Sequence, residues 1–196
     1  MALYSRERTK VSRDTEVDDI LANLRKKTKK VNSNRKGKRG EKNVCKKLIE
    51  RFQKPFSRNP DTFGSGAWST NKGDLQEELD LDHLAGDIIT PKGFSFCIEN
   101  KKGYDMEVFN LMSGANRKRD KKLLDEFIEQ AERDAERVGK IPMVLYAKDR
   151  CPVIAFIPEV EIRNRSTFLV MLRYGSYVGI SLGDLLELPD DFFFRL

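Results

Sequence analysis

Two acidic residues and a lysine with the spacing of a metal-dependent site lie between Asp87 and Lys101. β-Branched and aromatic residues on both sides of Pro91–Gly93 predict two short strands joined by a turn. Along the second strand, side chains alternate between two faces, so Glu99 shares a face with Lys101. With a three-residue turn, Asp87 lies opposite Cys97 and diagonal to Glu99, roughly 7–8 Å away. The opposite face of the strand then carries Phe94, Phe96 and Ile98.

Carboxylates at that separation suit a hard divalent cation, with Mg²⁺ as the expected ion and Mn²⁺ as a substitute. Such an ion promotes phosphodiester hydrolysis by lowering the pKa of a water and by offsetting charge on the phosphate. Lys101 would orient the water or stabilise the transition state. Two alternatives stay open at this point. A two-residue turn would move Asp87 to the other face, and a Glu-x-Lys pair is also common on solvated strands.

The composition excludes several other kinds of site. The 196 residues are 39% hydrophobic and 35% charged, and no apolar run is long enough for a membrane helix. A single histidine and three scattered cysteines argue against a zinc site and against Ser-His or Cys-His catalysis. No Gly-Lys-Ser/Thr follows Gly64–Gly66, so a nucleotide-binding P-loop is not expected. The odd number of cysteines and the lack of a Cys-x-x-Cys pair favour a reducing compartment, so we expect a cytoplasmic protein, in the host cytoplasm if the gene is viral.

Basic charge is concentrated at the N-terminus. Residues 1–40 carry a net charge of +8 and the remainder −2, for a total of +6. The basic runs 25–30 and 35–39 are typical of a phosphate-binding segment, and a solvated tail is the alternative. We therefore expect a basic arm over residues 1–36, with DNA as the partner.

Apolar periodicity predicts two helices that flank the candidate site. The first covers 40–52, and Glu41 lies at the N-terminal end of its apolar stripe, where a carboxylate is costly unless it is paired or metal-bound. The second covers 120–138, with Gln130 at the edge of its apolar face. Strands are predicted at 141–147 and 153–157.

The Gly86-Asp87 and Glu99-Asn100-Lys101 segments resemble the motif of the PD-(D/E)xK nuclease superfamily. A helix carrying Glu41 followed by Arg-x-Pro, Gly-Ser-Gly-Ala and these segments resembles the archaeal-type Holliday junction resolvases, over roughly residues 37–158. The resemblance implies an α/β fold with a restriction-endonuclease-like core, in which a mixed β-sheet is flanked by helices. It also implies a metal-dependent endonuclease that acts as a homodimer on four-way or other branched DNA.

The resemblance further implies roles for individual residues. Asp87, Glu99 and Glu41 would bind the metal, Lys101 would assist the attacking water, and Ser65 would lie near the active site. Arg58 would contact a phosphate. The further DNA-binding candidates are basic residues before Glu41 and after Lys101, namely Lys38, Arg39, Arg117, Lys118 and Arg119. The last three could equally open the helix that follows them.

Three features depart from the family pattern. Gly86 replaces the usual proline, and Asn100 replaces a small apolar residue, where an asparagine is compatible with an edge strand but weakens it. The acidic half of a long insert at 68–85 could supply a competing ligand such as Asp80 or Asp82, and Trp68 within the insert could stack on a base or simply pack. Residues 159–196 extend beyond the core domain (37–158) and should pack on it or form a dimer interface. A nuclease acting on linear or flap DNA, an inactive DNA-binding protein and a non-enzymatic α/β protein remain alternatives.

Overall fold

The computed structural model describes residues 33–59, 78–80, 84–112, 118–163 and 170–194, with side chains from Gly37 onward. These residues form one seven-stranded mixed sheet in the order β1-β2-β3-β4-β5-β7-β6. The strands are β1 (Ser57–Arg58), β2 (Ile88–Ile89), β3 (Phe96–Lys102), β4 (Ile141–Ala147), β5 (Ile154–Pro158), β6 (Val170–Tyr174) and β7 (Tyr177–Ser181). The helices are α2 (Ser33–Phe52), α5 (Val108–Met112), α6 (Lys118–Val138), α7 (Leu182–Leu186) and α8 (Asp190–Phe193), with a 3-10 turn at Glu159–Glu161. The predicted α/β fold, a mixed sheet flanked by helices, is confirmed.

The centre of the fold is a strand–helix–strand unit made by β3, α6 and β4. β3 and β4 pair in parallel over seven residues, and the other pairings described in the sheet are antiparallel. Parallel neighbours require a crossover connection, and the amphipathic helix α6 supplies it. Gly139, at a φ of 65°, follows α6 and lets the chain turn into β4.

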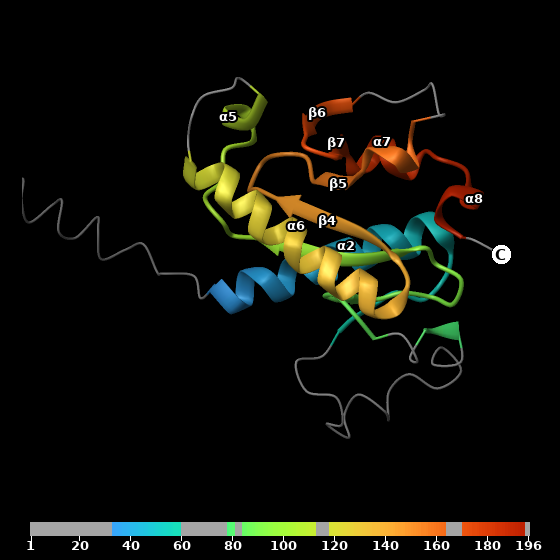
Figure 1. Cartoon of the computed structure of the whole chain (residues 1–196). Coiled ribbons are helices and arrows are strands. Elements are labelled where there is room, and N and C mark those ends of the chain that lie inside the picture. Colours follow the sequence, from blue (N-terminus) through green and yellow to red (C-terminus); the bar gives the residue numbers. More distant parts are fainter. Residues whose placement is uncertain (1–32, 60–77, 81–83, 113–117, 164–169, 195–196) are drawn as a thin grey trace, which may run out of the picture. The chain divides into compact units, whose positions relative to one another are not determined.

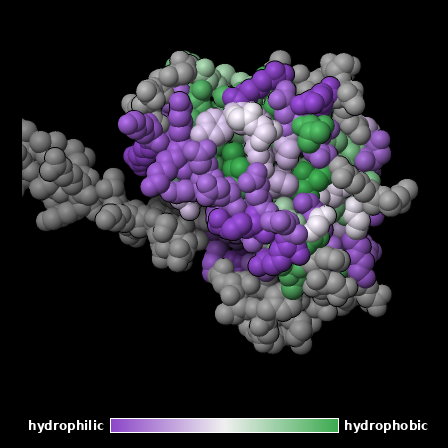
Figure 2. Space-filling model, in the orientation of Figure 1, coloured by the Kyte–Doolittle hydropathy of each residue, from purple (hydrophilic) through white to green (hydrophobic). Residues whose placement is uncertain are grey.

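Helices cover the two faces of this sheet. Figure 1 shows α6 in front of β4 and α2 behind it. On the α2 side, Leu48 and Phe52 pack with α7, α8 and the inward residues of the strands. On the other side, Leu124, Phe127 and Ile128 of α6 pack against β4 and β5. The outer surface of α6 is largely hydrophilic in the same view (Figure 2), as expected for a helix with a single apolar stripe.

The C-terminal segments are part of this core. β7 pairs with β5, which places the 170–181 hairpin within the sheet. Arg51 of α2 donates from Nε to the Leu186 carbonyl (2.6 Å) and from Nη2 to that of Leu188 (2.7 Å). Phe193 stacks on Phe94 with ring centroids 6.1 Å apart. Residues 182–194 therefore cover part of the α2 side of the sheet and pack against it.

The hairpin register differs from the prediction. Ile88 pairs with Ile98, which sets Asp87 level with Glu99 instead of opposite Cys97. The connection is longer than the predicted Pro91–Gly93 turn, because Pro91 bridges to Leu79 and Phe94 bridges to Phe194. The shift is two residues, so Asp87 keeps the predicted face.

Two further expectations need correction. Helix α2 begins at Ser33, seven residues before the predicted start, so the last four residues of the predicted arm are helical. Asn100 lies in β3, between β2 and β4, and not in an edge strand. Several predicted features fall outside the described residues, namely the arm up to residue 32, Ser65, Trp68, Asp82 and Arg117. Among the described helices, none has the length and apolar character needed to span a membrane.

Candidate active site

Asp87 is fixed by backbone contacts with both neighbouring strands. Its amide donates to the Ile98 carbonyl (2.9 Å), and its carbonyl accepts from the Asn59 amide (2.8 Å). Its carboxylate Oδ2 accepts from the Asn100 amide at 2.8 Å. Asn59 also donates from Nδ2 to the Gly86 carbonyl (2.8 Å). The carboxylate is therefore held at the level of Glu99 before any ligand binds.

Gly86 explains why this chain has no proline before the aspartate. Its φ of 70° lies in the left-handed region, which proline cannot adopt. A Cβ at this position would lie 2.5 Å from the Ile98 carbonyl oxygen. Glycine is therefore required both by the backbone conformation and by the close approach to β3.

Glu99, Lys101 and Gln130 form a closed ring of hydrogen bonds. Lys101 donates from Nζ to Glu99 Oε1 (2.6 Å) and to Gln130 Oε1 (2.8 Å). Gln130 donates from Nε2 to Glu99 Oε1 (2.6 Å). Glu99 and Lys101 are only 2% and 8% exposed, and Lys101 Nζ also lies 5.4 Å from the centre of the Phe127 ring. The side chain of Lys101 is thus held in one position beside the carboxylate.

Gln130 was not among the predicted site residues. The sequence places it at the edge of the apolar face of α6, and that position was its one available signal. A polar residue there is unremarkable alone. Its partners become apparent only when α6 packs over β3, because Glu99 and Lys101 lie 31 and 29 residues away in the chain.

The environment raises the pKa of Glu99 to about 7. Burial is the largest cause, and the negative charge of Asp87 adds to it, whereas the hydrogen bond and charge of Lys101 act in the opposite direction. Asp87 and Glu99 are therefore close enough to repel each other when both are ionised. A cation between them would relieve this repulsion, so the electrostatics suit a cation-binding carboxylate pair.

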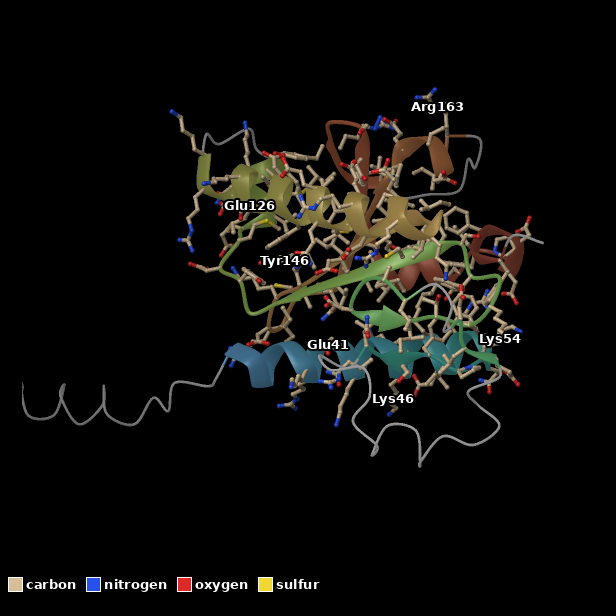
Figure 3. All side chains as sticks on the ribbon, turned by 60° about the horizontal axis from the view of Figure 1, so that its bottom comes forward. Glu41, Lys46, Lys54, Glu126, Tyr146 and Arg163 are labelled. Carbon is tan, nitrogen blue, oxygen red and sulfur yellow. The ribbon has the colours of Figure 1, made fainter. Side chains whose placement is uncertain are left out.

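Glu41 and Arg58 pair with each other. Arg58 Nε lies 3.5 Å from Glu41 Oε2, with both side chains partly buried. Glu41 projects from α2 toward the sheet, whereas Lys46 projects away from it (Figure 3). Glu41 thus has the inward orientation predicted from its helical stripe, and its described ionic contact is Arg58.

Asn100 faces the α2 side of β3, opposite to its neighbours Glu99 and Lys101. Its side chain is 5% exposed, and both its Nδ2 and its Oδ1 lack a hydrogen-bond partner among the described residues. A Cβ on Gly40 would lie 3.1 Å from Asn100 Nδ2, so glycine lets α2 approach β3 at this point. The backbone amide of Asn100 donates a hydrogen bond to Asp87, whereas its buried carboxamide makes none with the described residues.

Four of the predicted DNA-binding residues are dispersed over two helices. Lys38 and Arg39 lie on the exposed side of α2, and Lys118 opens α6 with Arg119, both of them exposed. Asp80, expected as a competing ligand, instead pairs with Lys140 at 2.8 Å. Lys140 also donates to Thr90 Oγ1 at 2.9 Å, so this pair joins the end of the insert to the α6–β4 turn.

The described residues bring together Asp87, Glu99 and Lys101, but they contain no cluster of three metal-ligating side chains. The hydrogen bonds described on the two carboxylates end on Oδ2 of Asp87 and Oε1 of Glu99. Asp87 Oδ1 and Glu99 Oε2 remain as hard oxygen donors, which is the donor chemistry that Mg²⁺ prefers. The pair fits a divalent cation held with further ligands from water or phosphate.

Comparison with known proteins agrees with this chemistry. One protein family, described as "Phage putative PDDEXK endonuclease", matches residues 32–182, which is more than half of the chain. Neither the curated proteins nor the solved structures contain a significant match. The match confirms the predicted PD-(D/E)xK superfamily and gives no substrate. The chain belongs to this phage family of PD-(D/E)xK endonucleases.

Proposed function

We propose that this chain is a Mg²⁺-dependent endodeoxyribonuclease that cleaves branched DNA, with four-way junctions as the preferred substrate. The observation that carries the nuclease part is the fixed pair of Asp87 and Glu99 beside the buried ammonium of Lys101. The order of motifs along the chain, from Glu41 to Lys101, supports the preference for junctions. Mn²⁺ should substitute for Mg²⁺, because both ions accept carboxylate and water ligands.

Asp87 and Glu99 would hold the ion, and Glu41 would complete the set of ligands. A bound Mg²⁺ would lower the pKa of a water molecule and offset charge on the phosphate. Lys101, held by Glu99 and Gln130, would orient that water and stabilise the charge that develops on the phosphate. Because Glu99 has a pKa of about 7, it must lose its proton before it can act as a ligand.

Arg58 would contact the phosphate next to the cleaved bond. Its contact with Glu41 is long and partly exposed, so a phosphate could replace the carboxylate at modest cost. Lys38, Arg39, Lys118 and Arg119 would bind neighbouring phosphates, and the same role is proposed for Arg117. Ser65, which lies outside the described residues, is proposed to act near the cleaved bond.

The homodimer is part of the same proposal. Symmetric cleavage of two strands at a junction requires two active sites, and a two-fold dimer provides them. Light scattering should therefore give a mass of two chains plus one junction for the complex with DNA. A monomer mass with and without DNA would contradict the dimer.

The deciding experiment compares a labelled four-way junction, a flap and a linear duplex in Mg²⁺ and in chelator. Asp87→Asn is the test variant, and Asp184→Asn, which changes an exposed carboxylate on α7, is the matched control. Paired nicks confined to the junction, absent in chelator and in Asp87→Asn but present in Asp184→Asn, are expected. Equal cleavage of all three substrates would reject the junction preference and leave the nuclease. Binding without cleavage would favour an inactive DNA-binding protein.

Removal of residues 1–32 separates the roles of the arm and the site, because α2 begins at Ser33. A nuclease should keep its cleavage activity at low salt and lose affinity as salt rises, since the arm contributes mainly non-specific phosphate contacts. A protein that only binds DNA through its arm should lose binding under all conditions.

A further inference from the structure

An exposed aromatic ring is linked to Lys101 through Phe127. Tyr104 follows the end of β3, three residues after Lys101, and is 44% exposed. Its ring makes a T-shaped contact with the ring of Phe127, with centroids 4.8 Å apart and planes inclined by 67°. Lys101 also lies near Phe127, with its Nζ 5.4 Å from the centre of the ring. The three side chains thus form a continuous path from the buried ammonium to an exposed aromatic surface.

The backbone under Tyr104 is fixed by the buried Tyr146, which is labelled in Figure 3. The Tyr146 hydroxyl lies 2.7 Å from the Met106 carbonyl and 3.1 Å from that of Tyr104, and it accepts from the Met106 amide at 3.2 Å. Burial raises the pKa of Tyr146, which keeps this hydroxyl protonated. The ring of Tyr104 is therefore presented on a fixed segment, which lowers the entropic cost of using it as a binding surface.

Positive charge accompanies the exposed ring. Asp105 is the next residue after Tyr104, and its Oδ2 lies 4.0 Å from Arg119 Nη1. The side chains of Asp105 and Arg119 are both exposed. An exposed ion pair of this kind contributes little to the stability of the fold, so the Arg119 guanidinium can exchange the Asp105 carboxylate for a phosphate. Lys118, also exposed, precedes Arg119. An aromatic face with an adjacent cation matches a nucleotide, whose base stacks while its phosphate pairs.

We propose that Tyr104 is a stacking platform for an unpaired nucleobase next to the cleaved phosphate, with Arg119 binding the phosphate of that nucleotide. The position of the cleaved phosphate rests on the proposed nuclease function. A base inside a continuous duplex is stacked between its neighbours and is not available to Tyr104. Bases at a flap or at a branch point that has opened are available, so this residue would favour branched DNA, including a junction opened at its centre, over a continuous duplex.

The test measures DNA binding in chelator, where no cleavage is expected. Labelled probes are a duplex with a single-stranded flap and the same duplex without it. Tyr104→Ala and Tyr104→Trp are compared with Phe109→Ala. Phe109 is the matched control because it is 72% exposed and makes no ring contact among the described residues. Tyr104→Ala should weaken flap binding about tenfold and duplex binding less than twofold, since stacking acts only on the unpaired base.

Tyr104→Trp should retain the wild-type preference for the flap, and Phe109→Ala should leave both affinities within about twofold. A 2-aminopurine at the first unpaired position should be quenched by the wild-type protein and by Tyr104→Trp, but not by Tyr104→Ala. Thermal unfolding of each variant verifies that it is folded.

Three results would overturn the platform. They are equal weakening of both probes by Tyr104→Ala, unchanged flap binding, or a Phe109→Ala effect as large as that of Tyr104→Ala. If the wild-type protein cleaves no DNA in Mg²⁺ but Tyr104→Ala still weakens flap binding selectively, the nuclease is rejected and the nucleobase site stands. The two proposals can therefore fail separately.

Discussion

The two sides of β3 are equally buried and chemically opposite. Ile98 and Glu99 are neighbours at 0% and 2% exposure, yet Ile98 faces α2 and Glu99 faces α6. On the α2 side, Phe94 and Phe96 belong to a cluster of aromatic rings with centroids 4.8 to 6.1 Å apart. On the α6 side, the same depth of burial encloses a carboxylate, an ammonium and an amide. One strand therefore carries both the core and the candidate site.

The comparison shows where this protein gains and where it loses folding free energy. Burying an aromatic side chain is favourable by roughly 1.5–3 kcal/mol. Burying a carboxylate is unfavourable, and the raised pKa of Glu99 shows that its partners do not fully compensate. We infer that the α2 side stabilises the strand while the α6 side keeps it ready to bind a cation.

The largest expected effect is on the α2 side. Phe94→Ala should lower the free energy of unfolding by about 3–5 kcal/mol, because Phe94 is 2% exposed and contacts the rings of Phe52, Phe56 and Phe193. Urea unfolding measures the change. Phe94→Leu is the control and should lose less, since it keeps most of the apolar volume. A loss below about 1 kcal/mol for Phe94→Ala would contradict the assignment of this side as the main source of stability.

On the α6 side, replacing a buried residue should increase the free energy of unfolding instead of lowering it. The folded protein keeps the Glu99 proton up to a pKa of about 7, above the ordinary value of 4.5. The native state thus binds more protons than the unfolded state between those values, and wild-type stability falls as pH rises through this window. Glu99→Gln removes the titration. It should be more stable than wild type at pH 8, on the order of 2–3 kcal/mol, with the difference disappearing near pH 4.

Urea unfolding at pH 4, 6 and 8 without divalent ions measures this difference. Added Mg²⁺ should then stabilise wild type at pH 8 more than it stabilises Glu99→Gln, because the neutral amide is a poorer ligand. Asp184→Asn, an exposed carboxylate variant, should show neither effect. A pH-independent difference for Glu99→Gln would mean that Glu99 titrates near its ordinary pKa.

A smaller loss of stability is expected from adding a methyl group at Gly86, where the backbone itself approaches β3. Gly86 and Gly139 both have a positive φ, of 70° and 65°. A Cβ at Gly139 would meet nothing within 4 Å, whereas one at Gly86 would lie 2.5 Å from the Ile98 carbonyl oxygen. Gly139→Ala should destabilise by about 1 kcal/mol from backbone strain alone, and Gly86→Ala by at least about 1 kcal/mol more. Equal thermal stability of the two variants would show that β3 yields to the added methyl group.

The smallest effect concerns Gln130. Gln130→Leu removes a hydrogen bond to ionised Glu99, so the pKa of Glu99 should rise further. We expect the pH profile of Mg²⁺-dependent cleavage to move to higher pH by less than about one unit. Glu129→Leu, at the exposed neighbouring position, is the control and should leave the profile in place. An unchanged profile in Gln130→Leu would limit Gln130 to a role in packing.

Local patterns were sufficient to predict much of β3 and its surroundings. Alternation along Phe94–Lys101 predicted both faces correctly, because a strand enforces a two-residue period whatever it pairs with. The apolar stripes likewise predicted α6 and the strands β4 and β5, with boundaries within two residues. The common feature of these successes is that the signal and the structure lie within one segment.

The errors involve partners that are distant in the chain. The observed β2–β3 register differs from the predicted one because Pro91 pairs with Leu79 and Phe94 pairs with Phe194. The rules for hairpin turns consider only the two strands and the turn, so they do not include these partners. The interior position of Asn100 depends on the parallel pairing with β4, and the role of Gln130 depends on how α6 packs on that pair. Asn59 was likewise not predicted to hold Gly86 and Asp87, because its contacts span 27 and 28 residues.

The parallel pairing of β3 with β4 has a consequence for how the protein folds. Glu99, Lys101 and Gln130 all belong to the continuous segment from β3 to β4, whereas Asp87 precedes β2 and joins them through hydrogen bonds to the backbone of Ile98 and Asn100. A parallel pair can close only after its crossover helix has formed, so its contacts carry a large loop-closure cost. Amide hydrogen exchange should therefore show β3, α6 and β4 opening as one cooperative unit, with the amides of Asn59 and Asp87 exchanging earlier through local opening at the sheet edge.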